Sequence, residues 1–145
     1  MFGVLRDTAA SRPEPPQPGL GDLPELVGSA RAAGMTVDYT CRVPPDGPAL
    51  MLGRTVYRVV QEALTNAGKH APGSAVRVLL DGAPGAELSV TVTNPCTGTH
   101  RRPAIPGAGL GLIGLRERIA LAGGRVEHGA EGGTFRLQAW LPWPT

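Results

Sequence analysis

The sequence predicts an α/β fold, a two-layer sandwich in which one mixed sheet carries three helices on one face. Apolar residues recur with helical spacing in some stretches and with the two-residue period of strands in others. The order along the chain is helix, strand, helix, two strands, a long loop, helix and two strands. Hydrophobic residues fill 41% of the 145 positions, which suits one packed core. Such an order is typical of helices that cover a single sheet.

Composition and charge exclude several classes of protein. No apolar run approaches the roughly 18 residues that a transmembrane helix needs, and the N-terminus lacks the pattern of a signal peptide. The two cysteines, Cys41 and Cys96, and the three scattered histidines form no disulfide or zinc pattern. A net charge of +2 is too small to indicate a nucleic-acid partner.

Glycine and proline mark the ends of the expected elements. The 21 glycines and 15 prolines make up about a quarter of the chain, the range in which disorder becomes an option. We therefore expect them in tails and loops. Residues 8–18 contain four prolines and no periodic pattern, which predicts a linker after a short apolar stretch, 1–6. The folded domain is expected over 19–145.

Three stretches have the apolar spacing of helices. In the first, 19–34, Asp22 is a candidate N-cap. The second, 50–71, is the clearest and has one apolar face, while the third, 109–124, begins and ends with glycines. The buried face of the second helix is expected to consist of Val56, Val60, Ala63, Leu64 and Ala67.

Five stretches alternate apolar and polar residues as strands do. A short link, GAPGA, is expected to join two of them into an antiparallel hairpin, and the last two are expected to close the sheet as a pair. The strands are expected at 35–43, 74–81, 87–94, 125–130 and 134–142.

A row of polar residues runs along the helix over 50–71. Glu62, Asn66 and Lys69 are spaced so that they share one face, which is expected to point outward, away from the apolar face. A carboxylate, an amide oxygen and an ammonium group suit a site for Mg²⁺ and phosphates, and the carboxylate could orient or deprotonate an attacking group. The alternative is an ordinary solvated helix face with a Glu–Lys pair.

A glycine-rich segment begins the third helix after a long loop. The loop, 94–108, is rich in proline, and a loop of that length is usually functional or mobile. The segment GAGLGLIG, 107–114, exposes backbone N–H groups at a helix N-terminus, where phosphates bind well. It also matches a dinucleotide fingerprint, but no strand directly precedes it. The alternative is a hinge whose glycines permit close packing.

Two smaller signals lie at strand ends. Asn94 ends a strand before the turn Pro95–Gly98, and an amide can read the edge of a base because it both donates and accepts hydrogen bonds. Gly132, Gly133 and Thr134 lie between the last two strands. Each signal has an ordinary alternative, an Asn-initiated turn and a hairpin turn.

The order of these signals resembles the catalytic ATP-binding domain of bacterial sensor histidine kinases. The run YRVVQEALTNAGKHA resembles the N box of the branch whose response regulators carry helix-turn-helix output domains. The run GLGLIGLRER resembles the second glycine box of that branch. The resemblance covers roughly residues 20–142 and implies the Bergerat ATP-binding fold of the GHKL proteins, with ATP and Mg²⁺ as ligands.

Carried over residue by residue, the resemblance implies a role for each matching position. Asn66 would hold Mg²⁺ through its side-chain oxygen, and Glu62 would be the catalytic residue that assists phosphoryl transfer. Residues 95–108 would form the ATP lid, and Thr134 would support the adenine end. The implied nucleotide-binding residues are Asn66, Lys69, His70, Asn94, Gly98, Gly107, Gly109, Leu110, Gly111, Leu112 and Thr134.

The first glycine box departs from the family pattern, which is Asp-x-Gly-x-Gly. Here the Asp that accepts a hydrogen bond from the adenine amino group is Asn94, and the first Gly is Cys96. A neutral acceptor forgoes about 1–2 kcal/mol, so nucleotide affinity is expected to be about tenfold lower. Weak ATP binding or relaxed selectivity for adenine is the resulting expectation.

The phosphoacceptor histidine of this family lies on a dimerisation helix, and nothing in residues 1–19 matches it. The resemblance therefore implies an isolated, monomeric catalytic domain with little autophosphorylation of its own, and residues 1–18 would be a remnant of the dimerisation region and a linker. The parent is expected to be a membrane-bound homodimer with this domain in the cytoplasm. Its expected partners are its own phosphoacceptor domain and a response regulator, with no nucleic acid.

Two other functions stay open. A degenerate GHKL relative could keep the fold and bind nucleotide with little turnover, which Asn94 and Cys96 favour. An anti-sigma-factor-type serine kinase would use the same fold on a protein partner, although the N box and the Arg-Glu-Arg helix start argue against it.

Overall fold

A computed structural model describes residues 18–44, 47–70, 73, 75–95 and 108–144. No helix in these ranges is long and apolar enough to cross a bilayer. The elements in chain order are a 3₁₀ turn η1 (Leu20–Asp22), α2 (Leu23–Ala32), β1 (Thr36–Arg42), α3 (Leu50–His70), β2 (Ala75–Gly82), β3 (Glu87–Pro95), α4 (Ala108–Leu121), β4 (Arg125–Glu131) and β5 (Thr134–Pro142).

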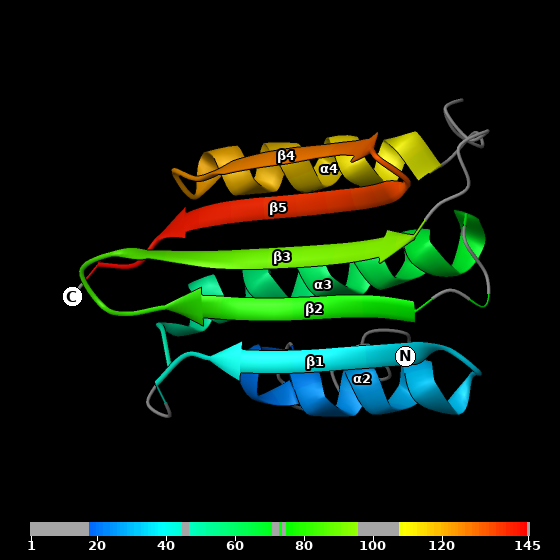
Figure 1. Ribbon diagram of the computed structural model, residues 1–145. Helices are drawn as coiled ribbons and strands as arrows, with labels where there is room; N and C mark the ends of the chain where they lie inside the picture. The colour runs from blue at the N-terminus through cyan, green and yellow to red at the C-terminus, as the bar shows by residue number, and fades with distance from the viewer. Residues whose placement is uncertain (1–17, 45–46, 71–72, 74, 96–107, 145) are drawn as a thin grey trace, which may run out of the picture.

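The elements form the predicted two-layer α/β sandwich. The sheet has five strands in the order β1-β2-β3-β5-β4. The β1–β2 pair is parallel and the other pairs are antiparallel, so the sheet is mixed. All three α-helices cover one face of the sheet and leave the other face free (Figure 1). The expected fold class, element order and hairpin between β2 and β3 are therefore confirmed.

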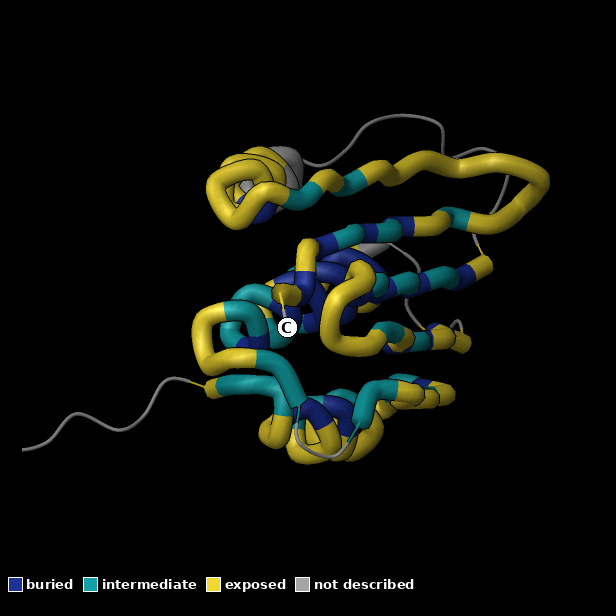
Figure 2. Tube along the Cα trace, turned by 90° about the vertical axis from the view of Figure 1, so that its left-hand side faces the viewer, coloured by how far each residue is buried: buried dark blue, intermediate teal, exposed yellow. Residues whose placement is uncertain are grey.

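The core lies between the helices and the sheet, where the buried residues gather (Figure 2). All five residues predicted for the buried face of α3 are less than 6% exposed, and Val59 joins them at 0%. On β2 and β3 every second side chain is buried, as the two-residue period predicts. The buried residues of these two strands are Val76, Val78, Leu80, Leu88, Val90, Val92 and Asn94.

The ends of the elements show where local signals act. Asp22 precedes α2 as expected, but it makes no side-chain cap to that helix. Its carboxylate instead accepts a hydrogen bond of 2.8 Å from the backbone N–H of Gly19 and so closes η1. Gly132 and Gly133, with φ of 61° and 82°, form the two-residue turn between β4 and β5. This turn needs positive φ at both positions, which glycine adopts without strain.

Candidate functional site

Four segments that carry predicted site residues meet at one end of the sandwich. The chain reaches this end at the last turns of α3 and the last residues of β3, and it leaves this end again at the starts of α4 and β5 (Figure 1). We call this the site end. It brings together segments that are far apart in the sequence, because β3 runs antiparallel to β5.

The polar row of α3 is partly buried at the site end. Asn66 is only 6% exposed, while Glu62 is half-buried and Lys69 is exposed. The expectation that the whole row points outward is therefore wrong for Asn66. It lies one position from Ala67 and one turn from Ala63, which are both buried, and α3 packs against β3 and α4. Burial suits a specific polar role for this amide better than an ordinary solvated helix face.

Asn94, at the end of β3, is the other buried polar residue in the described part of the chain. It is 5% exposed, and alternation along β3 places it on the helix-facing side with Val90 and Val92. Its Nδ2 donates a hydrogen bond of 3.0 Å to the carbonyl oxygen of Pro95. Only the NH₂ group can face a carbonyl oxygen, so the Oδ1 of Asn94 is oriented as an acceptor.

Strand register separates two neighbouring residues at the start of β5. Phe135 pairs directly with Asn94, whereas Thr134 pairs with Pro95. Paired residues point to the same face of a sheet, so Phe135 lies on the helix-facing side and Thr134 on the free face. From the sequence we named Thr134 and not Phe135, whereas the register places Phe135 beside Asn94. A signal was present in the sequence, because Phe135 lies two residues before the buried Leu137 and the two-residue period of a strand puts both on the same face.

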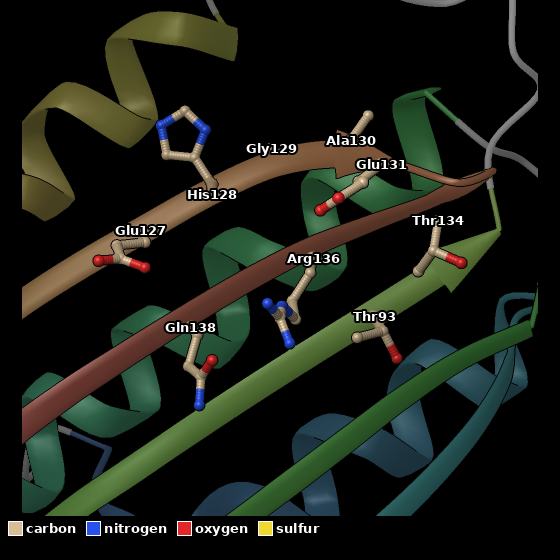
Figure 3. A pocket seen from close by; sticks show the side chains of 9 residues that line it. All are labelled: Thr93, Glu127, His128, Gly129, Ala130, Glu131, Thr134, Arg136 and Gln138. Carbon is tan, nitrogen blue, oxygen red and sulfur yellow. The ribbon is translucent and has the colours of Figure 1, made fainter.

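The free face beside Thr134 contains a shallow hollow of about 470 Å³. In Figure 3, α3 lies behind the sheet, and the side chains of Thr93, Thr134 and Arg136 stand on the near side. The hollow is lined by Thr93, Glu127, His128, Gly129, Ala130, Glu131, Thr134, Arg136 and Gln138. It lies on the opposite face of the sheet from Asn94, so it does not form part of the same site.

The first turns of α4 supply backbone donors at the site end. Gly109, Leu110, Gly111 and Leu112 belong to this helix, and its first turn contains no acidic residue. The first N–H groups of a helix have no partner within it and carry partial positive charge, so they attract anions. The side chains of residues 108–112 lie outside the described part, as do Gly98 and Gly107 and most of the expected lid.

Two histidines lie in or near the site end, His70 on α3 and His128 on β4. His70 is the last residue of α3, and only its backbone is described. On β4, the ring of His128 lies 6.4 Å from that of Phe135, centroid to centroid. His128 is exposed overall, but loss of water around the part of its ring that packs against the protein, and then repulsion by Arg116, lower its pKa below its ordinary value. The neutral imidazole is therefore favoured next to Phe135.

Comparison with known families supports a nucleotide site. The model of the histidine kinase-, DNA gyrase B- and HSP90-like ATPases matches residues 52–145. The chain belongs to this family. The matched part includes nearly all of α3, the whole of α4 and four of the five strands, so it contains all the segments that meet at the site end.

Solved structures share the fold of this ATPase domain. The blue-light activated histidine kinase of Erythrobacter litoralis EL346 has a TM-score of 0.61 at 19% identity, over 87% of this chain and 45% of that one. Full-length ShkA in complex with AMPPNP has a TM-score of 0.63 at 22% identity, and the match covers 87% of this chain and 29% of ShkA. The mycobacterial sensor histidine kinase MprB has a TM-score of 0.53 at 23% identity, and the match covers 81% of this chain and 91% of that one. This chain thus spans less than half of the first two proteins.

The donor set of this ATPase domain fits Mg²⁺ bound together with a nucleotide. The described residues contain no group of three His, Cys, Asp or Glu side chains that could hold a metal ion. Mg²⁺ commonly uses one or two protein oxygens and completes its shell with phosphate oxygens and water. The buried Asn66 at the site end offers one such oxygen, so the ion would depend on the nucleotide for most of its ligands.

Proposed function

We propose that this chain is the ATP-binding catalytic domain of a two-component sensor histidine kinase. It would bind Mg·ATP and donate the γ-phosphoryl group to a histidine on a dimerisation domain, from which a response regulator with a helix-turn-helix output domain would receive it. One observation carries the proposal. The two buried polar residues of the described chain, Asn66 and Asn94, lie at the end of the sandwich where α4 begins, and the N-terminus of a helix attracts anions.

The geometry supports one orientation of the nucleotide. The base would lie against Phe135 with its edge toward the Oδ1 of Asn94, since these residues pair across β3 and β5 on the helix-facing side. The phosphates would lie at the first turn of α4, with Lys69 on the exposed side of α3. Asn66 would hold Mg²⁺ through its amide oxygen. When bound, the ion neutralises charge on the phosphates as the γ-phosphoryl group is transferred.

Glu62 would assist the transfer. It lies one helical turn before Asn66 on the same side of α3 and is half-buried. As the nitrogen of the acceptor histidine forms its bond to the γ-phosphorus and ADP departs, the imidazole N–H loses its proton, and the carboxylate of Glu62 would orient that N–H or accept the proton. The remaining catalysis would be positioning and charge neutralisation.

Titration of Mg·ATP into the full chain by calorimetry tests the metal assignment. Asn66→Ala is expected to abolish the Mg²⁺-dependent part of the binding while the circular dichroism spectrum stays unchanged. Thr65→Ala is a matched control, because Thr65 is the exposed neighbour on the same helix, and it should bind as the unaltered protein does. Binding by Asn66→Ala that still depends on Mg²⁺ would remove Asn66 from the site.

The same titration with GTP tests the role of Asn94. Its Nδ2 is engaged by Pro95, so the Oδ1 would accept a hydrogen bond from the 6-amino group of adenine but would face the 6-oxo group of guanine unfavourably. ATP is therefore expected to bind about tenfold or more tightly than GTP. Equal affinities would show that the amide rotates freely and that selectivity for adenine is relaxed.

A second candidate is a nucleotide-binding module with little turnover. The neutral, buried Asn94 favours it, because a neutral acceptor binds an amino group more weakly than a carboxylate does. The two functions differ in one measurement, the phosphohistidine formed on a separately supplied dimerisation domain of the parent kinase. We expect phosphorylation that requires Glu62, and a chain that binds ATP but transfers nothing would be the module. The cytoplasmic placement and the membrane-bound homodimeric parent remain parts of this proposal.

A further inference from the structure

A large groove lies at the end of the sandwich opposite the site end. It has a volume of about 1140 Å³ and runs between the start of α3, the end of α4 and the residues that follow β5. Its apolar lining includes Pro18, Met51, Tyr57, Leu121, Pro142 and Pro144. We call it the α3–α4 groove. Nothing in the proposed nucleotide site uses it.

The groove is unusually apolar for a surface open to water. Met51 is 73% exposed and Leu121 is 90% exposed, and Leu50, next to Met51, is 61% exposed. Of the large hydrophobic side chains that the described residues expose, only Ile113 lies away from the start of α3 and the end of α4. A clustered apolar patch of this kind indicates a surface that something covers.

The groove also lacks negative charge to match its cations. Arg54, Arg58 and Arg118 line it, and no Asp or Glu belongs to its lining. The Nε of Arg54 is buried and has no hydrogen-bond partner among the described residues. A buried N–H without an acceptor costs free energy. The covering group should therefore bring a carboxylate as well as apolar side chains.

We infer that residues 1–17 of the same chain fold back into this groove. Met1, Phe2, Val4 and Leu5 would cover Met51 and Leu121, and Glu14 would form an ion pair with the guanidinium group of Arg54, which lines the groove. Pro18 itself lines the groove, so the segment that precedes it starts there. The segment combines an apolar stretch, MFGVL, with the carboxylates of Asp7 and Glu14, which is the chemistry that the groove lacks.

The reach of the segment is sufficient. In an extended proline-rich conformation of about 3.1 Å per residue, Glu14 can lie up to about 12 Å from Pro18, and residues 7–17 can span about 34 Å. The part of α3 that lines the groove, Met51 to Gln61, is about 15 Å long. A tethered segment is also present at an effective concentration in the millimolar range, which favours it over a second copy of the chain.

Oxidation of Met51 by hydrogen peroxide, followed by peptide mapping of the full chain, tests the inference. Phe2→Asp combined with Leu5→Asp should make Met51 oxidise about tenfold faster, because a docked segment leaves the residue open only about a tenth of the time. Thr8→Asp combined with Ser11→Asp adds the same charge at polar positions of the segment and should leave the rate unchanged. The half-buried Met35 serves as the internal reference.

Two results would overturn the inference. If Met51 oxidises at the same rate in all three proteins, residues 1–5 do not cover the groove. If protection of Met51 grows with protein concentration, a second copy covers it instead.

Disulfide trapping tests the same contact independently of methionine chemistry. In a chain carrying Cys41→Ser and Cys96→Ser, Val4→Cys and Leu121→Cys should form a disulfide within one molecule under oxidised glutathione. Val4→Cys with Thr40→Cys is the control, because Thr40 is exposed on β1 and faces the helix-free side. Equal trapping of both pairs, or disulfides only between molecules, would contradict the inference.

Discussion

Asn94 is held in one orientation by Pro95, the residue that follows it. The hydrogen bond from Nδ2 to the carbonyl oxygen of Pro95 is 3.0 Å long, and the side chain is 5% exposed on the helix-facing side of β3. The amide therefore presents its oxygen, and it can take the place of a carboxylate as an acceptor without carrying the negative charge. A substitution of Asn94 can therefore change nucleotide affinity and the stability of the fold in different directions.

Asn94→Asp is expected to change affinity and stability in opposite directions. A charged acceptor should strengthen Mg·ATP binding about tenfold. Without nucleotide, the second carboxylate oxygen would face the carbonyl of Pro95 in a buried site, and the free energy of unfolding should fall by about 1–3 kcal/mol. Calorimetry and urea denaturation measure the two effects. An unchanged affinity would contradict the placement of Asn94 against the base.

Phe135 and Thr134 should differ in their effect on ATP binding. Phe135 pairs with Asn94 on the helix-facing side, while Thr134 points to the free face. Phe135→Leu keeps an apolar side chain, but it loses ring contacts worth about 0.5–1.5 kcal/mol, so ATP should bind roughly three- to tenfold more weakly. Thr134→Val, an isosteric change, should leave the affinity within about twofold. Calorimetry measures both affinities. A loss of affinity larger than twofold in Thr134→Val would show that the hydroxyl of Thr134 takes part in ATP binding.

The stability of the domain should depend on pH through His128. Partial desolvation of the exposed ring, and then repulsion by Arg116, lower the pKa of His128 in the folded state, so the unfolded state binds the proton more readily. The free energy of unfolding should therefore decrease as pH falls through the unfolded value of about 6.5, and it should be fully retained above that value.

Urea denaturation at several pH values between neutral and acidic checks this dependence. His128→Gln should flatten the part of the profile below neutral pH, and Arg116→Gln should reduce it, because repulsion is the smaller of the two causes. A profile of His128→Gln that runs parallel to that of the unaltered protein would assign the dependence to other groups.

Substitution of glycine by alanine should change the free energy of unfolding in opposite directions at two positions. A Cβ at Gly124 would meet the carbonyl oxygen of Trp140 and approach the Cδ2 of Leu141 to 3.0 Å, so Gly124→Ala should lower the free energy of unfolding by about 1–3 kcal/mol. Gly28 lies within α2 with nothing within 4 Å of a Cβ. Gly28→Ala should therefore raise it by about 0.5–1 kcal/mol, and similar effects of both changes would contradict the close packing at Gly124.

Local patterns were enough to predict the elements and the class of fold. The spacing of Val56, Val60, Ala63 and Leu64 identifies the buried face of α3, since residues three and four apart share one side of a helix. The two-residue period likewise predicted the buried sides of β2 and β3. These patterns are reliable because each depends on a single contact, that of one face of a helix or strand with the apolar core. The pattern is the same whichever residues form the other side of that core.

The candidate site needed the tertiary structure. By sequence alone Asn66 belonged to an outward-facing row, and the packing of α3 against its neighbours buried it. Sequence also singled out Thr134, whereas the register of β5 against β3 placed Phe135 beside Asn94. A shift of one residue in that register would exchange the two faces.

The amino-acid sequence by itself thus determined which side chains are apolar, where helices and strands form, and that polar groups suited to phosphates and a base recur in a characteristic order. Only the tertiary structure decided which of those groups are buried at the site end and that an apolar, cationic groove lies at the other end. The reason is physical. Periodicity is set by neighbours along the chain, while register, layer packing and the burial of a polar group depend on residues far apart in sequence.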